Sequence, residues 1–366
     1  MHDPTGVNPP SKSPLLHIRQ AEPLNAGPPL DKLVHEFITP TQLFFVRSHG
    51  QVPQLDPSDY QLTIDGQVQH PLKLGIADLA SFPRMRLTAS LQCAGNRRDE
   101  LYAIGPIPGE LPWGADGIST GEWEGVPLRV VLEAAGVVPE AQHIALVGYD
   151  TTMRLGNEIP FGGSIPIAKA LGSEVLLADR LNGAPLPATH GGPLRLLVPG
   201  MIGARSVKWL RSITLQAEPS QNYFQAHAYK LFPPDATAEN VDWSGGIMLG
   251  DLSITSVICA PPAGSTIPTG SVALSGYAMA GGGRTIERVD ITCDGGRSWV
   301  QATLGKSEPW AWRLWHAEVQ LERGSQQFAV RAWDSAANTQ PEQYRDVWNF
   351  KGYMNNAWHR IDLIGA

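Results

Sequence analysis

The last third of the chain is a series of short strand-like segments separated by turn signals, and this pattern constrains the fold more than any other feature. From residue 252 onward, apolar and β-branched runs such as SVALSGYAMA and QFAVRAWD alternate with turn sequences such as PPAGS, GGGR and DGGRS. Strands at this spacing, without helical periodicity between them, are typical of an antiparallel sandwich. We therefore expect an all-β, immunoglobulin-like sandwich over residues 241–366.

Two cysteines fall within these predicted strands. In RVDITCDGG, the alternation places Val289, Ile291 and Cys293 on one face of a strand, and Cys259 ends a similar strand. Buried thiols behave as small hydrophobic groups. We therefore interpret Cys259 and Cys293 as core residues without a chemical role.

The first two thirds of the chain mix strand and helix signals. Residues 60–66 alternate as a half-buried strand does, and residues 127–136 begin with proline and end at glycine, as a helix does. Residues 165–172 predict a second short helix, residues 175–187 a hairpin around Asn-Gly, and residues 194–200 a short strand. Because the regular βαβ rhythm and the glycine-rich nucleotide motifs are missing, we expect an α+β fold.

The predicted α+β domain covers residues 35–240, since a polar segment rich in proline and glycine follows residue 233. Residues 1–34 carry many prolines and polar side chains and predict a flexible N-terminal arm.

Charge and hydropathy exclude several classes of partner. The chain has 28 basic and 35 acidic residues and no basic run, which argues against nucleic-acid binding. It contains no apolar run of the roughly 18 residues that a membrane span needs. Because the N-terminus also lacks the pattern of a secretory signal, we expect a cytoplasmic protein. Its three cysteines form no CxxC pair, so a zinc ribbon and a c-type haem are not expected.

Cys93 is the cysteine expected to carry chemistry. It follows an alternating stretch and precedes AGNRR, where small residues permit an irregular turn and Arg97 and Arg98 supply positive charge. Fixed positive charge favours the thiolate, which is the form that binds metals. Local context alone is equally compatible with a strand-end cysteine whose neighbouring arginines face solvent.

Basic side chains gather in several glycine-containing turns. Each turn taken alone could be a solvated loop, but in an acidic protein the joint pattern indicates a local anion site. The segments are FFVRSHG, THGGPLRLLVPG and GARSVKWL, with Arg47, His49, His190, Arg195, Arg205 and Lys208.

These segments, with LQCAGNRR, LPWGADGISTGEWEGVPLR and NTQPE…WNFKGYMNNAWHR, resemble the sulfite oxidase family of molybdenum enzymes from about residue 35 to the C-terminus. The resemblance implies a sulfite-oxidase-type molybdopterin domain followed by a sandwich. It also implies molybdenum bound by one pyranopterin dithiolene, with Cys93 as the protein's metal ligand. A soft thiolate suits such a centre. The implied cofactor-binding residues are Phe45, Val46, Arg47, Ser48, His49, Cys93, Asp150, His190, Arg195, Arg205, Ser206, Val207 and Lys208.

The family's substrate pocket is a small cationic cup, and its residues match Arg47, Arg98, Trp113 and Tyr229. Lys351 stands where the sulfite oxidases have an arginine, so the charge is kept without the bidentate fork. Ser48 stands where asparagine is usual, and the run GYMNNAWHR is similar to assimilatory nitrate reductases of the same superfamily.

The resemblance implies molybdenum-dependent oxidation of sulfite to sulfate by oxo transfer. Electrons would pass to oxygen or to a separate carrier, which the sequence does not identify, and the sandwich would mediate a homodimer. Lys351 and its neighbours favour the alternative of a reductase acting on nitrate or another small oxo compound. A non-catalytic binding protein with a vestigial cleft is the remaining alternative.

Overall fold

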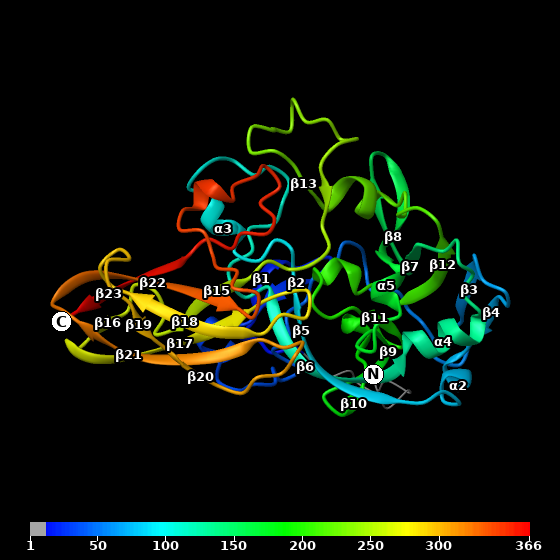
Figure 1. Cartoon of the computed structure of the whole chain (residues 1–366), viewed down its shortest axis with the longest axis horizontal. Coiled ribbons are helices and arrows are strands. Elements are labelled where there is room, and N and C mark those ends of the chain that lie inside the picture. The colour runs from blue at the N-terminus through cyan, green and yellow to red at the C-terminus, as the bar shows by residue number, and fades with distance from the viewer. Residues whose placement is uncertain (1–11) are drawn as a thin grey trace, which may run out of the picture.

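The computed structural model describes residues 12–366, and the chain forms two strand-rich regions side by side (Figure 1). The helices are short, so strands dominate the expected α+β domain as well. Among residues 12–366, no helix is long and apolar enough to cross a membrane. The helices are α1 (Leu30–Leu33), α2 (Ile76–Leu79), α3 (Arg98–Leu101), α4 (Leu128–Ala135), α5 (Ile167–Ala170), the 3-10 helices η1 (Ala188–His190), η2 (Gly203–Arg205) and η4 (Tyr344–Asp346), and the π-helix η3 (Phe224–Ala228).

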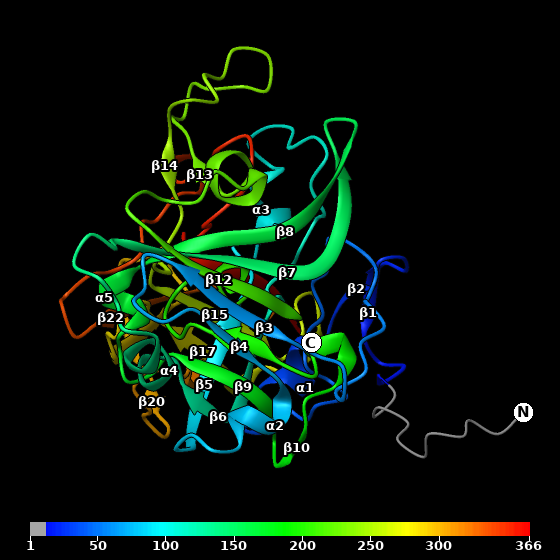
Figure 2. The same ribbon diagram turned by 90° about the vertical axis from the view of Figure 1, so that its right-hand side faces the viewer.

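Two sheets build the first region. The first has the order β4-β3-β12-β7-β8, in which only the β3–β12 pair is parallel. Its long hairpin β7–β8 curves past the other strands in Figure 2. The strands are β3 (Leu62–Gly66), β4 (Leu72–Leu74), β7 (His143–Arg154), β8 (Asn157–Pro166) and β12 (Leu210–Gln216).

The second sheet carries the metal-ligand candidate at the end of β5. Its order is β10-β9-β6-β5, with β11 also paired to β9. The predicted Asn-Gly hairpin joins β9 to β10, and Asn182 and Gly183 both have positive φ values of 51° and 76°, as such a two-residue turn requires. The strands are β5 (Met85–Gln92), β6 (Ile118–Pro127), β9 (Leu176–Leu181), β10 (Ala184–Pro185) and β11 (Arg195–Leu197).

Helix α4 has the ends that the sequence predicts. Pro127 stands at the N-cap, and Gly136 closes the helix with φ 71°, a conformation that favours glycine. Its apolar face buries Leu128, Val131 and Leu132 in the first region's core. The helix predicted at 165–172 is shorter and occupies Ile167–Ala170.

The N-terminal segment differs from the expected flexible arm. Residues 12–34 contain the antiparallel pair β1 (His17–Gln20) and β2 (Asn25–Gly27) and helix α1, and Ala26 bridges to Val46. Arg19 makes a two-point contact with the buried carboxylate of Asp116, at 2.9 and 2.7 Å. Composition suggested flexibility, but these long-range contacts order the segment. Residues 1–11 lie outside the described part of the chain.

The C-terminal region is a two-sheet sandwich, as the strand spacing predicts. The short pair β13 (Lys230–Leu231) and β14 (Ile247–Met248) precedes it. One sheet has the order β15-β17-β21-β20 and the other β16-β23-β22-β18-β19, and an apolar core lies between them. The strands are β15 (Thr255–Ala260), β16 (Thr266–Ile267), β17 (Gly270–Met279), β18 (Ile286–Thr292), β19 (Val300–Gln301), β20 (Thr303–Leu304), β21 (Arg313–Leu321), β22 (Gly324–Asp334) and β23 (His359–Gly365).

The two cysteines of the sandwich have different surroundings. Cys259 is buried, as predicted, and burial raises its pKa far above the ordinary value. The prediction for Cys293 is wrong, because β18 ends at Thr292 and the thiol lies exposed in the following turn. The simple alternation also fails at Asp290, which is buried and contacts the Arg288 guanidinium at 2.8 Å.

The two regions share a continuous contact surface at β5. Ser90 donates its backbone N–H to the Trp310 carbonyl at 3.0 Å, and its hydroxyl accepts from the Trp312 backbone N–H at 2.8 Å. From the sandwich, the Tyr277 hydroxyl donates to the Ala115 carbonyl at 2.8 Å. The strand that leads to Cys93 is therefore paired with β6 on one edge and held by the Trp310–Trp312 segment of the sandwich on the other.

Candidate active site

Cys93 lies directly after β5, with 7% of its surface exposed, and lines a pocket in the first region. Its backbone N–H donates to the Gly117 carbonyl at 2.8 Å, and the Gly95 N–H points to its Sγ at 3.4 Å. A Cβ at Gly117 would lie 3.4 Å from the Cys93 Cβ and 3.3 Å from the Trp113 ring. A side chain at Gly117 would therefore crowd Trp113 and the Asn96 amide oxygen, 3.1 Å away, beside Cys93.

The two arginines after Cys93 are engaged away from its sulfur. Arg97 is fully buried and has a positive φ of 66°, and its guanidinium binds the Glu100 carboxylate at 2.9 and 2.7 Å. Arg98 donates to the carbonyls of Lys351 and Gly352 at 3.1 and 3.2 Å. Both guanidinium groups therefore have hydrogen-bond partners other than the Cys93 sulfur.

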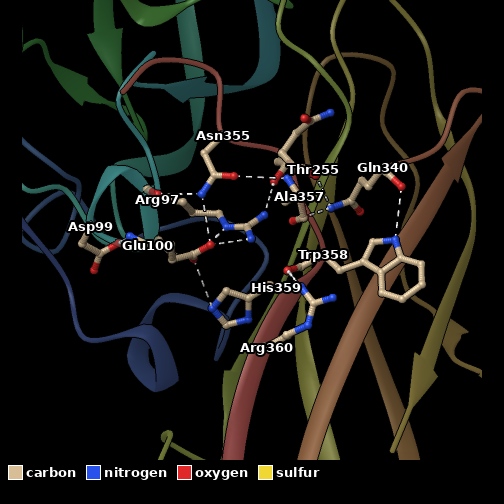
Figure 3. A network of polar contacts seen from close by, with 12 residues as sticks. Arg97, Asp99, Glu100, Thr255, Gln340, Asn355, Ala357, Trp358, His359 and Arg360 are labelled. Carbon is tan, nitrogen blue, oxygen red and sulfur yellow. Dashed lines mark hydrogen bonds and ion pairs between the residues drawn. The ribbon is translucent and has the colours of Figure 1, made fainter. Parts of the chain in front are cut away.

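Arg97 belongs to a buried network that joins α3 to the sandwich (Figure 3). The Asn355 amide donates to the Arg97 carbonyl at 2.8 Å and to Glu100 at 3.1 Å, and His359 lies 3.8 Å from Glu100. Burial, the largest single influence, would raise the Glu100 pKa, but the charge of Arg97, the neighbouring His359 and the hydrogen bonds from Arg97 and Asn355 together outweigh it, so the pKa is lowered. Burial lowers the pKa of His359 to about 4, so this imidazole is neutral at pH 7. The network thus fixes the turn that carries Cys93.

One wall of the pocket is a cationic cradle. The Lys208 ammonium donates to the Ser48 hydroxyl at 2.7 Å and to the Thr189 carbonyl at 3.2 Å. Burial and then the nearby Arg195 lower the Lys208 pKa to about 7. Burial raises the pKa of Asp150, in the same wall, to about 6. Such shifts show that this wall is poorly solvated and short of negative charge.

Arg195 and His190 complete the cradle. Arg195 donates to the carbonyls of His190 and Ser206, both at 2.8 Å, and burial lowers its pKa to about 9. Burial, followed by the charge of Lys12, lowers the pKa of His190 well below the ordinary value. Lys12 Nζ lies 2.6 Å from His190 Nε2. When Lys12 is protonated it can only donate, so in that state Nε2 accepts and the ring proton is on Nδ1.

Arg47, His49 and Tyr229 form a second hydrogen-bonded group in the pocket lining. His49 Nε2 lies 3.0 Å from the Arg47 guanidinium and 3.1 Å from the Tyr229 hydroxyl. Burial first, and then Arg47, lower the His49 pKa well below its ordinary value. The Arg47 guanidinium also donates to Asn25 at 3.1 Å, so the N-terminal segment supports this group.

Arg47 and His49 also line a wider opening beside the cofactor pocket, together with Glu110, Lys351 and Tyr353. Lys351 forms an ion pair with Glu110, whose other carboxylate oxygen lies 3.5 Å from the Arg98 guanidinium. The sandwich therefore contributes Lys351 to the mouth of the site.

The structure brings most predicted site residues together but places a few elsewhere. The pocket is lined by Cys93, by the predicted residues from Phe45 to His49, and by Asp150, His190, Arg195, Ser206, Lys208 and Tyr229. Arg205 is buried outside the pocket lining and donates to the Leu249 carbonyl at 3.0 and 2.7 Å. The Val207 side chain is buried in the core and does not line the pocket, so a role for Val207 would fall to its backbone and stays a prediction. Both were carried over with their neighbours, and a motif does not show which way each side chain faces.

Sequence reasoning missed Lys12 and Glu110. Lys12 donates to the carbonyls of Thr41 and Phe44, both at 2.7 Å, in addition to its contact with His190. In the sequence, Lys12 is marked only as a single basic residue in a proline-rich segment. Glu110 directly precedes the motif LPWGADGISTGEWEGVPLR, and its only signal was its position three residues before Trp113.

The pocket suits a phosphate-bearing pterin with a thiolate-bound metal. Cys93 supplies the soft donor, and the cradle supplies charge for a phosphate. Within residues 12–366, Asp150 Oδ1 and Trp113 Nε1 are buried without a hydrogen-bond partner. The Asp150 oxygen is an acceptor that the N–H groups of a pterin could satisfy, because unpaired buried polar atoms are costly.

Comparisons with known proteins define the class. Residues 49–224 match the family described as oxidoreductase molybdopterin binding domain, and residues 247–365 match the Mo-co oxidoreductase dimerisation domain. Sulfite oxidase of Gallus gallus is 41% identical over 98% of this chain and 80% of its own length. Sulfite oxidase of Arabidopsis thaliana is 41% identical over 97% of this chain and 95% of its own length.

A solved structure agrees with these relatives. The sulfane dehydrogenase SoxCD of Paracoccus pantotrophus has a TM-score of 0.77 and 29% sequence identity, covering 96% of this chain and 85% of that one. These matches define a molybdopterin-dependent oxidoreductase. The chain belongs to the sulfite oxidase family of molybdenum enzymes, and the expected cofactor, molybdenum with molybdopterin, is confirmed at the level of the family.

Proposed function

We propose that this protein oxidises sulfite to sulfate at a molybdenum centre bound by Cys93. The single observation that carries the proposal is the placement of the Cys93 thiol in one pocket with the cationic cradle, beside a second group of cations at the mouth. Sulfite oxidase relatives at 41% identity over nearly the whole chain support this choice of substrate.

Each wall of the pocket has a separate task. The Cys93 thiolate holds the metal, while Lys208, Arg195 and His190 hold the cofactor's phosphate and pterin. When bound, the cofactor supplies oxygen-atom transfer and takes up the two electrons of the reaction. Arg47 attracts the substrate anion, and the Tyr229 hydroxyl, whose proton faces His49 Nε2 in this structure, would turn away from His49 to donate a hydrogen bond to the substrate. Burial raises the Tyr229 pKa, so the phenol keeps its proton at pH 7.

The test combines metal analysis with turnover. Purified protein should contain close to one molybdenum per chain and should oxidise sulfite with ferricyanide as electron acceptor. The Cys93→Ser variant should lose turnover, because a hydroxyl is a poor substitute for a soft thiolate ligand. Molybdenum-loaded protein that fails to oxidise sulfite would refute the choice of substrate, and folded protein that takes up no molybdenum would favour a non-catalytic binding role.

Lys351 supports nitrate reduction as a second candidate. The lysine is paired with Glu110 and lacks the fork of an arginine, which reduces the positive charge available to a dianion. The same preparation should therefore be assayed for nitrate reduction with reduced methyl viologen. Nitrate turnover that exceeds sulfite turnover would favour this candidate.

The proposal extends to the assembly and its surroundings. We infer that the sandwich is immunoglobulin-like and pairs two copies of the chain, which is supported by the match of residues 247–365 to a dimerisation domain. Light scattering on the purified protein should give twice the mass of 39.6 kDa. A cytoplasmic location and electron transfer to oxygen or a separate carrier stay predictions.

A further inference from the structure

The mouth of the site contains a carboxylate where a substrate anion would be expected. Glu110 places one oxygen on the Lys351 ammonium and the other 3.5 Å from the Arg98 guanidinium. Its side chain is 14% exposed, and those of Lys351 and Arg98 are 16% and 3% exposed. A partly desolvated carboxylate held by two cations resembles a bound oxyanion in shape and charge.

The surroundings show that this carboxylate belongs to the site. Glu110 lines the opening together with Arg47, His49 and Lys351. Burial is the largest influence on the pKa of Tyr229 and raises it. The negative charge of Glu110 also raises this pKa, whereas the positive charge of Arg98 lowers it. The carboxylate is therefore within electrostatic range of the predicted catalytic phenol.

Arg98 has further partners that hold it in place whether or not Glu110 stays. It donates to the backbone carbonyls of Leu111, Lys351 and Gly352 at 2.8 to 3.2 Å and lies over the Tyr353 ring. Lys351 has no such set of backbone acceptors among the contacts of residues 12–366, and its ammonium is fixed mainly by Glu110. Displacing Glu110 would therefore free Lys351 while leaving Arg98 in position.

We propose that Glu110 is an internal competitor for the substrate oxyanion. Before substrate binds, the Glu110 carboxylate occupies Lys351 and Arg98 in place of the anion, and after the reaction it returns to these cations and displaces the product. The inference rests on the proposed function, because it takes sulfite as the incoming anion and sulfate as the product. Glu110 lowers the affinity of the site for both dianions and speeds the release of sulfate. The carboxylate thus limits product inhibition.

The experiment measures sulfate binding to the molybdenum-loaded protein by calorimetry at low ionic strength, without turnover. Glu110→Gln keeps the shape of the side chain but removes the competing charge. We expect it to lower the Kd for sulfate about tenfold, since charges a few ångströms apart near a surface interact strongly. Sulfate inhibition of sulfite oxidation should strengthen in parallel. Glu110→Ala serves as a second variant if the glutamine variant does not load cofactor.

Glu158→Gln is the matched control. Glu158 lines the same opening and binds the Thr151 hydroxyl at 2.6 Å, so its loss removes the same charge without freeing Lys351. We expect a change of less than about twofold, in keeping with an exposed charge in high dielectric. In addition, Lys351→Gln should weaken sulfate binding more strongly in the Glu110→Gln background than in the wild type.

Unchanged or weaker sulfate binding in Glu110→Gln would overturn the proposal and make Glu110 a scaffold for the two cations. Equal effects of Glu110→Gln and Glu158→Gln would also overturn it, because general electrostatics would then account for both. Failure of the wild type to oxidise sulfite is a separate outcome, since it refutes the proposed function while the sulfate titrations still decide the role of Glu110.

Discussion

Replacing Glu100 by glutamine tests the buried network of Figure 3. The Arg97 guanidinium is fully buried, and Glu100 provides its two shortest charged contacts, at 2.9 and 2.7 Å. Removing one partner of a buried ion pair leaves an uncompensated charge and costs about 3–5 kcal/mol. We therefore expect the free energy of unfolding to fall by that amount in Glu100→Gln.

The expected change in Tm follows from the size of the chain. Unfolding entropy is roughly 2.1 cal/mol/K per residue, so a chain of 366 residues that unfolds as one unit has an unfolding entropy of roughly 0.8 kcal/mol/K. A loss of about 3–5 kcal/mol then lowers the Tm by about 4–6 °C. Scanning calorimetry of wild type and variant at pH 7 measures this difference.

Glu342→Gln is the control for this experiment. Glu342 pairs with Arg360 at 3.8 Å, and its side chain is 48% exposed, so the pair is solvent-screened. Exposed pairs of this kind contribute about 0–1 kcal/mol. If Glu100→Gln lowers the Tm no more than Glu342→Gln does, the buried charge of Arg97 is compensated in another way and the reasoning is refuted. The double variant Arg97→Met/Glu100→Met should recover part of the loss, because it leaves no unpaired charge.

Three further predictions concern the cofactor pocket and the cysteines. Under native conditions a maleimide should label exposed Cys293 rapidly and buried Cys259 not at all, while Cys93 should react only in cofactor-free protein; labelling of Cys93 in loaded protein would contradict metal ligation. Lys12→Gln should release molybdenum faster during dialysis, because His190 loses the donor 2.6 Å from its Nε2, and metal retention equal to wild type would contradict this role. The pKa values of Lys208 and Lys12 are lowered from about 10.5 to about 7, so the unfolded chain binds more protons than the folded chain between these two pH values. Cofactor-free protein should therefore lose stability as the pH falls from about 10.5 to about 7, and its stability should change little below pH 7. The cofactor's phosphate should restore the charge of Lys208, which lines the pocket, so the rise in Tm on loading should be larger at pH 7 than at pH 10, and equal shifts would refute this linkage.

Local patterns predicted the elements whose ends and faces are set by nearby residues. Helix α4 has Pro127 and Gly136 at its ends, and the hairpin at Asn182 has the turn that its two residues require. The strand ending before Cys293 was misjudged by one residue, which moved the thiol from the core to the surface. In a strand of period two, a boundary error of one residue is enough to do this.

The gathering of the site could be anticipated from the family motifs, whereas the orientation of single side chains could not. Arg205 and Lys208 stand three residues apart in one motif, yet only Lys208 enters the pocket, because η2 turns Arg205 toward Leu249. The contacts of Lys12 with His190 and of Glu110 with Lys351 span 178 and 241 positions. Interactions at that range depend on the whole fold and leave no periodicity in the sequence.

The contributions of distant segments to the pocket have a consequence for biosynthesis. The pocket wall runs from Phe44 to Tyr229, and its mouth is completed by Lys351 and Tyr353 near the end of the chain. A growing polypeptide cannot assemble this wall until its first two thirds have been made, and it cannot complete the mouth until almost the last residue. The walls that hold the cofactor therefore cannot form before residue 229 has been made, and a product that ends before Lys351 lacks the mouth where the substrate anion would bind.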